Sequence, residues 1–219
     1  MIKRTLAAVA MTVVAGSSGA ATISNGSFED IGGGTLNSSG WNLFTSIPDW
    51  TADHRVEVQS NPTIGAVDAQ HGFHYVELVT NRNDSLLQDV FLEIGMYKLS
   101  FFYSPRVSTT GTTSNDMAYS VGTPQDTLTS GVVEGGPGPD TPWGSWTEIT
   151  SVFSVTEAGN YTLSFTATGS ANARGCGNCG ALIDNVTLAT MPLPASSLLL
   201  LAGVVGLGAV GVRNQRRRG

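Results

Sequence analysis

The stretch Gly95-Met96-Tyr97-Lys98-Leu99-Ser100-Phe101-Phe102-Tyr103 decides the fold class. Tyr97, Leu99, Phe101 and Tyr103 stand at every second position, so in an extended chain they all project to one face. The residues between them project to the opposite face. This period of two predicts a β-strand with one side in a hydrophobic core.

The same period recurs outward from this stretch in both directions. It is clearest at Tyr161, Leu163 and Phe165, which alternate with Thr and Ser. Gly and Pro clusters separate the runs, and no segment of ten or more residues between 22 and 190 has a convincing helical period. The sequence therefore predicts an all-β antiparallel sandwich or barrel. The further expected strands span 56–59, 75–79, 86–92, 117–121, 148–155 and 181–188.

Charge is distributed unevenly along the chain. Of 11 Lys and Arg residues, six lie near the two ends, whereas all 17 Asp and Glu lie between Glu29 and Asp184. The middle of the chain thus has five basic against 17 acidic residues, a net charge of −12. Such a surface repels phosphate backbones, so nucleic-acid binding is excluded as the main role.

The first 21 residues have the pattern of a secretory signal peptide. Lys3 and Arg4 precede an apolar stretch from Leu6 to Ala15, and small residues follow. Cleavage after Ala20 or Ala21 by signal peptidase fits this pattern. We therefore expect export, with a single mature domain over 22–190.

The last 29 residues, 191–219, have three parts in series. Met191-Pro192-Leu193-Pro194-Ala195 precedes an apolar run from Leu198 to Val212, and an Arg cluster ends the chain. The run is at the lower length limit for spanning a bilayer, and the Arg cluster would stay in the cytoplasm. A plain single-pass membrane anchor is the alternative to a sorting signal.

This end resembles the PEP-CTERM class of bacterial sorting signals in its Val-Pro-Leu-Pro-Ala variant, with Met191 in place of Val. The resemblance implies a transient inner-membrane helix, processing by an exosortase, and delivery to the envelope, surface or matrix of a Gram-negative bacterium that makes exopolysaccharide.

The central region has a second resemblance, carried by the order of several short motifs. It is similar to jelly-roll domains of the galactose-binding-like superfamily, to the family of unknown function numbered 642, and to several carbohydrate-binding modules. The resemblance implies a jelly-roll β-sandwich. The motifs are Asn25-Gly26-Ser27-Phe28-Glu29, Trp41, Trp50, Gly72-Phe73-His74-Tyr75-Val76-Glu77-Leu78, Gln88, Gly95-Met96-Tyr97-Lys98-Leu99-Ser100-Phe101 and Gly180-Ala181-Leu182-Ile183-Asp184-Asn185-Val186.

Asp184 is expected inside the protein. If Leu182, Val186 and Leu188 point into the core, the period of two places Asp184 on the same side, where a carboxylate needs a cation, hydrogen-bond donors or a proton. Glu29 follows Phe28, the expected core residue of a first strand that lies near the last one. Two carboxylates with backbone carbonyls suit a structural Ca²⁺, and the related modules hold Ca²⁺ with matching residues. The alternative is that Asp184 caps a turn through backbone N–H groups.

Cys176 and Cys179 are the only cysteines and are spaced C-x-x-C. In an exported protein this pattern favours a structural disulfide in the loop before the last strand, with redox or metal-binding roles as alternatives.

A sugar site needs an aromatic face and polar groups for hydroxyls. Trp143 lies in a Gly/Pro loop and is the leading candidate, with Tyr75 and Tyr103 as further faces. Arg106 follows a strand and is expected either to hold a ligand or to pair with an Asp or Glu. Trp41, Trp50 and Trp146 are expected in the core.

These features favour a non-catalytic module that binds extracellular polysaccharide. The alternatives are a structural matrix or surface protein without a sugar site and a glycan-active enzyme. The enzyme is disfavoured because no pair of carboxylates stands out from the general acidity.

Overall fold

The computed structural model describes residues 23–64, 67–80, 82–106, 115–135, 144–169 and 180–191. All regular structure in these residues is β, which confirms the predicted class. The ten strands are β1 (Trp41–Ile47), β2 (Trp50–Ser60), β3 (His74–Glu77), β4 (Ser85–Leu92), β5 (Gly95–Pro105), β6 (Met117–Gly122), β7 (Thr127–Val133), β8 (Thr147–Val155), β9 (Gly159–Ala167) and β10 (Ala181–Met191).

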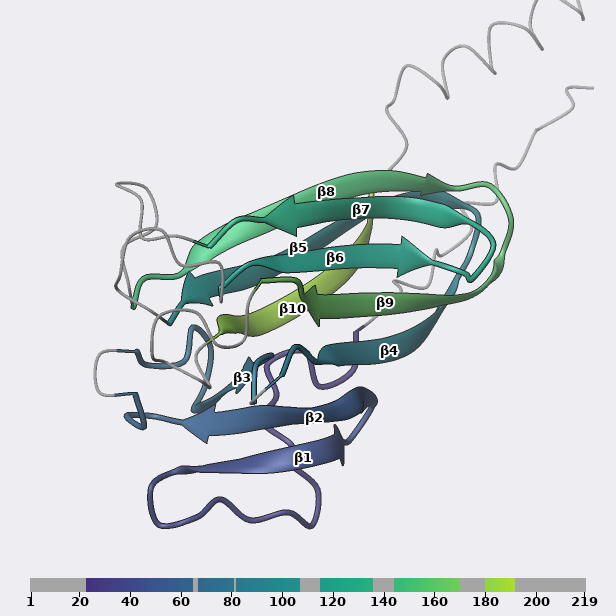
Figure 1. The fold of residues 1–219 in the computed structure, drawn as a ribbon. Helices are drawn as coiled ribbons and strands as arrows, with labels where there is room; N and C mark the ends of the chain where they lie inside the picture. Colours follow the sequence, from purple (N-terminus) through teal and green to yellow (C-terminus); the bar gives the residue numbers. More distant parts are fainter. Residues whose placement is uncertain are drawn as a thin grey trace, which may run out of the picture.

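The strands form an antiparallel sandwich that approaches a closed barrel. Their order is β7-β6-β9-β4-β2-β3-β10-β5-β8, and β1 pairs with β2. β2 joins the two layers, because its first half pairs with β4 and its second half with β3. The two ends of the series, β7 and β8, lie side by side (Figure 1), where Thr129 and Ser151 share a hydrogen bond of 2.7 Å between their hydroxyl groups.

The core between the layers is built from the alternating residues. Tyr97, Leu99, Phe101 and Tyr103 of β5 are all at most 1% exposed. Phe101 packs edge-on against Phe165 of β9, with ring centroids 4.8 Å apart. The prediction that these two strands turn their apolar sides to one core is therefore confirmed.

Two strands were not expected, β1 and β7. Each has one paired neighbour and buries few apolar side chains; in β1 these are Phe44 and Ile47, whereas β7 has no fully buried residue. Periodicity reports burial of one face, so strands that bury little leave a weak signal.

The segment before β1 corrects one expectation. Phe28 is fully buried, but it lies in a turn with φ of 57° and not in a strand. The segment still lies beside the last strand, because Val186 N donates to Gly26 O at 2.8 Å. A Cβ at Gly26 would collide with the Val186 carbonyl oxygen, so this close approach requires glycine.

The structure also corrects the prediction of which β10 side chains point into the main core. Ala181 and Ile183 belong to the main core, whereas Leu182 packs in a separate cluster on the other side of the sheet. The register shifts between Asp184 and Thr187, and this bulge returns the strand's later apolar residues to the main core. Asp184 is buried as expected, but it is on the outer face of the sheet and not in the main core.

Several predicted features lie outside the described residues. These are the signal peptide, Trp143, Cys176 and Cys179, and Pro192 to the C-terminus; Met191 ends β10. Within the ranges that the structure describes, no helix is long and apolar enough to cross a membrane.

Candidate functional site

The outer face of the sheet formed by β2, β3 and β10 is buried as deeply as the inner face. The segment that joins β2 to β3 covers it, and Val67 of this segment packs on Tyr75 and Leu182. Trp146 adds its ring edge-on to Tyr75, with centroids 5.9 Å apart, and donates from Nε1 to Asp68 O at 2.8 Å. Polar side chains at alternate positions of these strands are therefore removed from water.

Two of these polar side chains are carboxyl groups that lie directly opposite each other. Glu57 of β2 is paired in register with Glu77 of β3. Gln59 bridges them, because its Nε2 donates to Glu57 Oε1 at 2.7 Å and to Glu77 Oε2 at 2.5 Å. Gly180 N donates to the other oxygen of Glu77 at 2.8 Å, and Tyr75 Oη donates to Gln59 Oε1 at 3.3 Å.

Arg106 supplies the positive charge of this cluster. It directly follows β5, and its backbone N–H donates to Asn115 Oδ1 at 3.0 Å. Its guanidinium donates to Glu77 Oε2, and Nη1 lies 4.0 Å from Glu57 Oε1. Of the two roles expected for Arg106, the structure shows the pairing with an acidic residue, and the role in ligand binding stays a prediction.

Burial controls the protonation of the two carboxyl groups. Glu77 is fully buried, and loss of water raises its pKa to about 8, although Arg106 opposes the shift. Burial also raises the pKa of Glu57. Burial thus favours uptake of a proton by this pair of carboxyl groups, whereas the Arg106 guanidinium favours their ionised forms.

A hollow of about 200 Å³ opens on this cluster. Its lining residues are Ser39, Trp41, Glu57, Thr63 and Arg106. Trp41 begins β1 opposite Gln59 and is half-buried. An aromatic ring, a guanidinium, a carboxylate and two hydroxyls thus meet in one small space, which is the combination that a sugar ring requires.

The turn that carries Ser39 and Trp41 is tied to the β2–β3 segment. Thr63 Oγ1 and Ser60 Oγ both donate to Gly40 O, at 2.8 and 3.0 Å. Gly40 has φ of 84°, and a Cβ there would lie 2.5 Å from Thr63 Oγ1, so no other residue fits without strain. These bonds fix one wall of the hollow.

The two tyrosines predicted as ligand faces are placed differently. Tyr103 is 0% exposed in the main core, where its hydroxyl donates to Asn115 O at 3.1 Å. Tyr75 is likewise 0% exposed. Neither ring offers a face to a ligand, because strand alternation turns one inward and a covering segment encloses the other. Their contacts support Arg106 through Asn115 and the carboxyl pair through Gln59.

Trp41 is predicted in the core from the sequence, but the structure places its half-buried ring in the lining of the hollow. Its position directly after Asn37-Ser38-Ser39-Gly40, a turn-forming run, was the available signal that it stands at a strand end. Trp50 was also assigned to the core, and at 1% exposure this prediction is confirmed.

Glu29 and Asp184 are brought to one loop, as the metal hypothesis requires. Glu29 Oε1 accepts from Phe73 N and His74 N, both at 2.8 Å. Asp184 accepts from His71 N at 2.9 Å and from Asn185 N at 2.6 Å, which is the backbone capping of the alternative reading.

Burial raises the pKa of Asp184 to about 7, and the nearby Glu29 charge adds to the shift. A cation would relieve this cost, and the all-oxygen chemistry suits Ca²⁺. In the described part of the chain no cluster of three or more His, Cys, Asp or Glu is arranged to hold a metal, so backbone oxygens would have to complete the shell.

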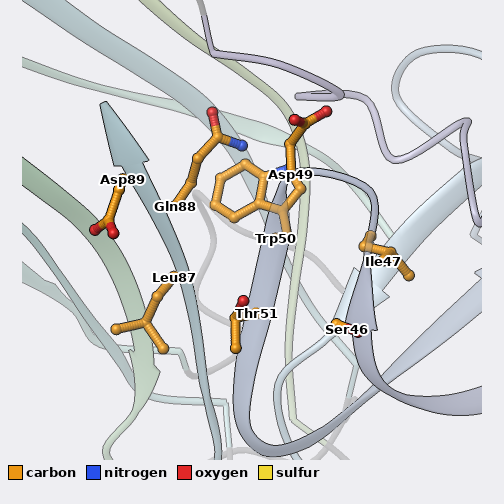
Figure 2. Close-up of a pocket in the computed structure, with 8 residues that line it drawn as sticks. All are labelled: Ser46, Ile47, Asp49, Trp50, Thr51, Leu87, Gln88 and Asp89. Atoms are coloured by element: carbon orange, nitrogen blue, oxygen red, sulfur yellow. The ribbon is translucent and has the colours of Figure 1, made fainter. Parts of the chain in front are cut away.

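A larger hollow of about 380 Å³ lies between the β1–β2 turn and β4. Figure 2 shows Asp49 and Gln88 on one side of the Trp50 ring and Asp89 apart from them. Two of its polar side chains already have partners: Gln88 exchanges two hydrogen bonds with the Ser24 backbone, and Asp89 Oδ1 accepts from Thr162 at 2.7 Å. With Trp50 buried and no cation in its lining, this hollow suits a sugar less well than the one at Arg106.

The sequence matches no model of a protein family and no curated protein. Its fold, however, is found in solved structures. A cyclase from Fischerella sp. TAU in complex with 4-(1H-indol-3-yl)butan-2-one superposes with a TM-score of 0.56 at 12% identity, covering 80% of this chain and 98% of that chain. At this identity the likeness shows a shared fold.

Carbohydrate-binding modules are also among the structural neighbours. A family 61 module in complex with β-1,4-galactotriose has a TM-score of 0.48 and 18% identity, and covers 78% of this chain and 99% of that chain. A family 35 module from Clostridium thermocellum has a TM-score of 0.45 and 16% identity, with 69% of this chain and 98% of that chain covered.

Proposed function

We propose that the protein is a non-catalytic module that binds extracellular polysaccharide, and that Trp41, Glu57 and Arg106 hold a sugar residue of the chain. The observation that supports this most is the hollow itself. It combines a half-buried indole with a charge pair that is already fixed by buried partners, so little side-chain ordering is needed when a ligand binds.

The arrangement of the carboxyl groups favours binding over catalysis. Glycoside hydrolysis requires two carboxyl groups on either side of the scissile bond, roughly 5 Å or more apart. Here Glu57 and Glu77 accept from the same Gln59 nitrogen, and Glu77 has 0% exposure. They therefore lie on the same side of the hollow, with Glu57 in its lining and Glu77 behind it, and Glu77 does not reach a ligand.

A glycan array followed by titration calorimetry tests this function. We expect an oligosaccharide that binds the wild type to lose at least about tenfold in affinity to Trp41→Ala, since aromatic anchors dominate such sites. Phe91→Ala is the matched control, because Phe91 is an exposed aromatic on β4 outside the hollow. If no glycan binds, or if both variants lose equally, the protein is better described as a structural matrix or surface protein.

Export and sorting are proposed on the sequence pattern of residues 1–21 and 191–219. In this proposal signal peptidase and an exosortase process the two ends, and the domain reaches the envelope, surface or matrix of a Gram-negative bacterium. Mass spectrometry of the protein recovered from culture tests it. Mature ends near Thr22 and near Pro194 are expected, and recovery of the full-length chain would contradict it.

A structural Ca²⁺ at Glu29 and Asp184 is proposed on their shared loop and on the burial of Asp184. When bound, the ion would supply the positive charge that this pair lacks. We expect the melting temperature of the wild type to fall on addition of chelator and that of Asp184→Asn to stay unchanged. Equal melting of the wild type with and without chelator would contradict it.

A further inference from the structure

The hollow at Arg106 favours positive ligands in spite of its arginine. The Arg106 guanidinium already donates to Glu77 and lies 4.0 Å from Glu57, so two acidic groups share one basic group. With both carboxyl groups ionised the three side chains carry one net negative charge. Burial raises the pKa of both carboxyl groups, so a proton supplies the missing positive charge when no other cation does.

Glu57 is the acidic group that a ligand can reach. Its side chain is 9% exposed and lines the hollow. Oε1 accepts from Gln59, whereas among the described residues no hydrogen bond or ion pair reaches Oε2. Oε2 is not among the buried polar atoms that lack a partner, so it is accessible from the hollow, and an incoming N–H group can donate a charge-assisted hydrogen bond to it.

Trp41 adds to the same preference. An indole face attracts a cation within about 6 Å of its centroid, and Trp is the strongest of the aromatic side chains in this respect. Ser39 and Thr63 provide hydroxyls at the same hollow for the neutral groups of a ligand.

The negative charge of the whole domain argues against an acidic polysaccharide as the ligand. The central part of the chain carries 17 acidic residues against five basic ones. An acidic polysaccharide would be repelled by this surface, whereas a basic one would be attracted to it. A uronate in the hollow would also be repelled by the Glu57 carboxylate. The Arg106 guanidinium would compensate this repulsion only in part, because it already pairs with Glu77.

We propose that the hollow binds an amino sugar with a free, protonated amino group, such as a glucosamine unit of a partly deacetylated polysaccharide. The ammonium lies against Glu57 and the Trp41 ring, and the hydroxyls face Ser39 and Thr63. This inference rests on the proposed function and narrows it to one class of sugar.

Titration calorimetry at pH 6 with three hexasaccharides tests the inference: β-1,4-linked glucosamine, its fully N-acetylated form, and galacturonate. We expect the glucosamine hexamer to bind at least about tenfold more tightly than the acetylated one, and the galacturonate hexamer not to bind. If the acetylated form binds equally well, or galacturonate binds best, the inference is overturned while the proposed function stands. If no oligosaccharide binds, both fail.

Two variants distinguish binding in the hollow from general attraction of a basic ligand to the acidic surface. Glu57→Gln keeps an oxygen for Gln59 and is expected to lose at least about tenfold in affinity for the glucosamine hexamer. Glu93→Gln removes the same charge at an exposed position in the β4–β5 connection and is expected to bind as the wild type does. Equal losses in the two would show non-specific attraction and overturn the inference.

Two further measurements guard against a misfolded variant and against binding of any polyamine. Ser39 is exposed, so Ser39→Lys folds as Ser39→Ala does, yet it places a cation at the hollow. We expect Ser39→Lys to weaken binding of the glucosamine hexamer much more than Ser39→Ala does, because only the lysine places a positive charge beside the ammonium group. Spermidine carries ammonium groups without a sugar ring; if it binds as tightly as the hexamer, the sugar class is wrong, and weaker binding supports it.

Discussion

The two faces of the sheet made by β2, β3 and β10 are both dry, yet they are stabilised differently. Val56, Val58 and Val76 on the inner face pack into the main core. Glu57 and Glu77, one position away on the same strands, are equally removed from water but depend on Gln59, Arg106 and backbone donors. Apolar burial needs only matching shape, whereas polar burial needs a specific partner for each atom. The inner face therefore stabilises the fold at any pH, whereas the outer face contributes stability that depends on charge and carries the groups of the proposed binding site.

The largest expected effect is on the inner face. Phe101→Ala removes a fully buried ring that packs on both Tyr119 and Phe165, and we expect a loss of about 3–5 kcal/mol in the free energy of unfolding. Denaturant unfolding at pH 5 and pH 8 measures it, and the loss should be the same at both. Phe91→Ala, at an exposed position, should change stability by less than about 0.5 kcal/mol. A loss at Phe101 that depends strongly on pH would contradict the contrast between the faces.

The next effect is on the outer face and depends on pH. Arg106→Met leaves the Glu77 carboxylate without its cation, and breaking such a buried pair costs about 3 kcal/mol or more when the carboxylate is charged. At pH 6 Glu77 is protonated, so the loss should be smaller than at pH 9. Chemical denaturation at the two pH values checks this, and equal losses would show that Arg106 contributes packing alone.

A smaller effect is expected in the pH dependence of the wild type. Burial raises the pKa of Glu77 from 4.5 to about 8, so between these values the folded state binds more protons than the unfolded state. Stability should therefore fall as pH rises from about 4.5 to about 8. In protein without a bound cation, Asp184, whose pKa burial raises from 3.8 to about 7, adds a further fall in stability between those two pH values.

Glu77→Gln tests which group is responsible for the upper part of this slope. The amide keeps an oxygen acceptor and has no proton to lose, so the decline of stability between pH 7 and pH 8 should flatten. Unfolding curves across pH 4.5–8.5 for both proteins measure it. An unchanged slope in Glu77→Gln would assign the decline to other residues.

The same contrast explains what could be predicted from the sequence. The inner face was predicted because Tyr97, Leu99 and Phe101 follow the period of two, and the structure buries all three. Burial of the outer face was not predicted, because polar residues at alternate positions, such as Glu57 and Gln59, are typical of a strand face that is exposed to solvent. Their burial arises from the segment between β2 and β3, and no local sequence pattern predicts that this segment covers the sheet.

Individual site residues show the same limit. Arg106 was identified from its place after a strand, but which Glu it pairs with depends on the β2–β3 register. Asp184 was expected to be buried, yet the bulge that sets its face is not visible in the periodicity. Trp41 and Trp50 looked alike in sequence, and only the packing separates the half-buried ring at the hollow from the buried one in the core.

The most direct test of the account is an NMR titration of ¹⁵N-labelled protein with an oligosaccharide that binds in the array, observed at the indole N–H groups. The Trp41 signal is expected to shift with ligand concentration. The Trp50 signal should stay in place, because that ring is 1% exposed and its Nε1 donates to Asn25 O at 3.0 Å. A shift at Trp50 with Trp41 unmoved would contradict the assignment of the binding site to the hollow at Arg106.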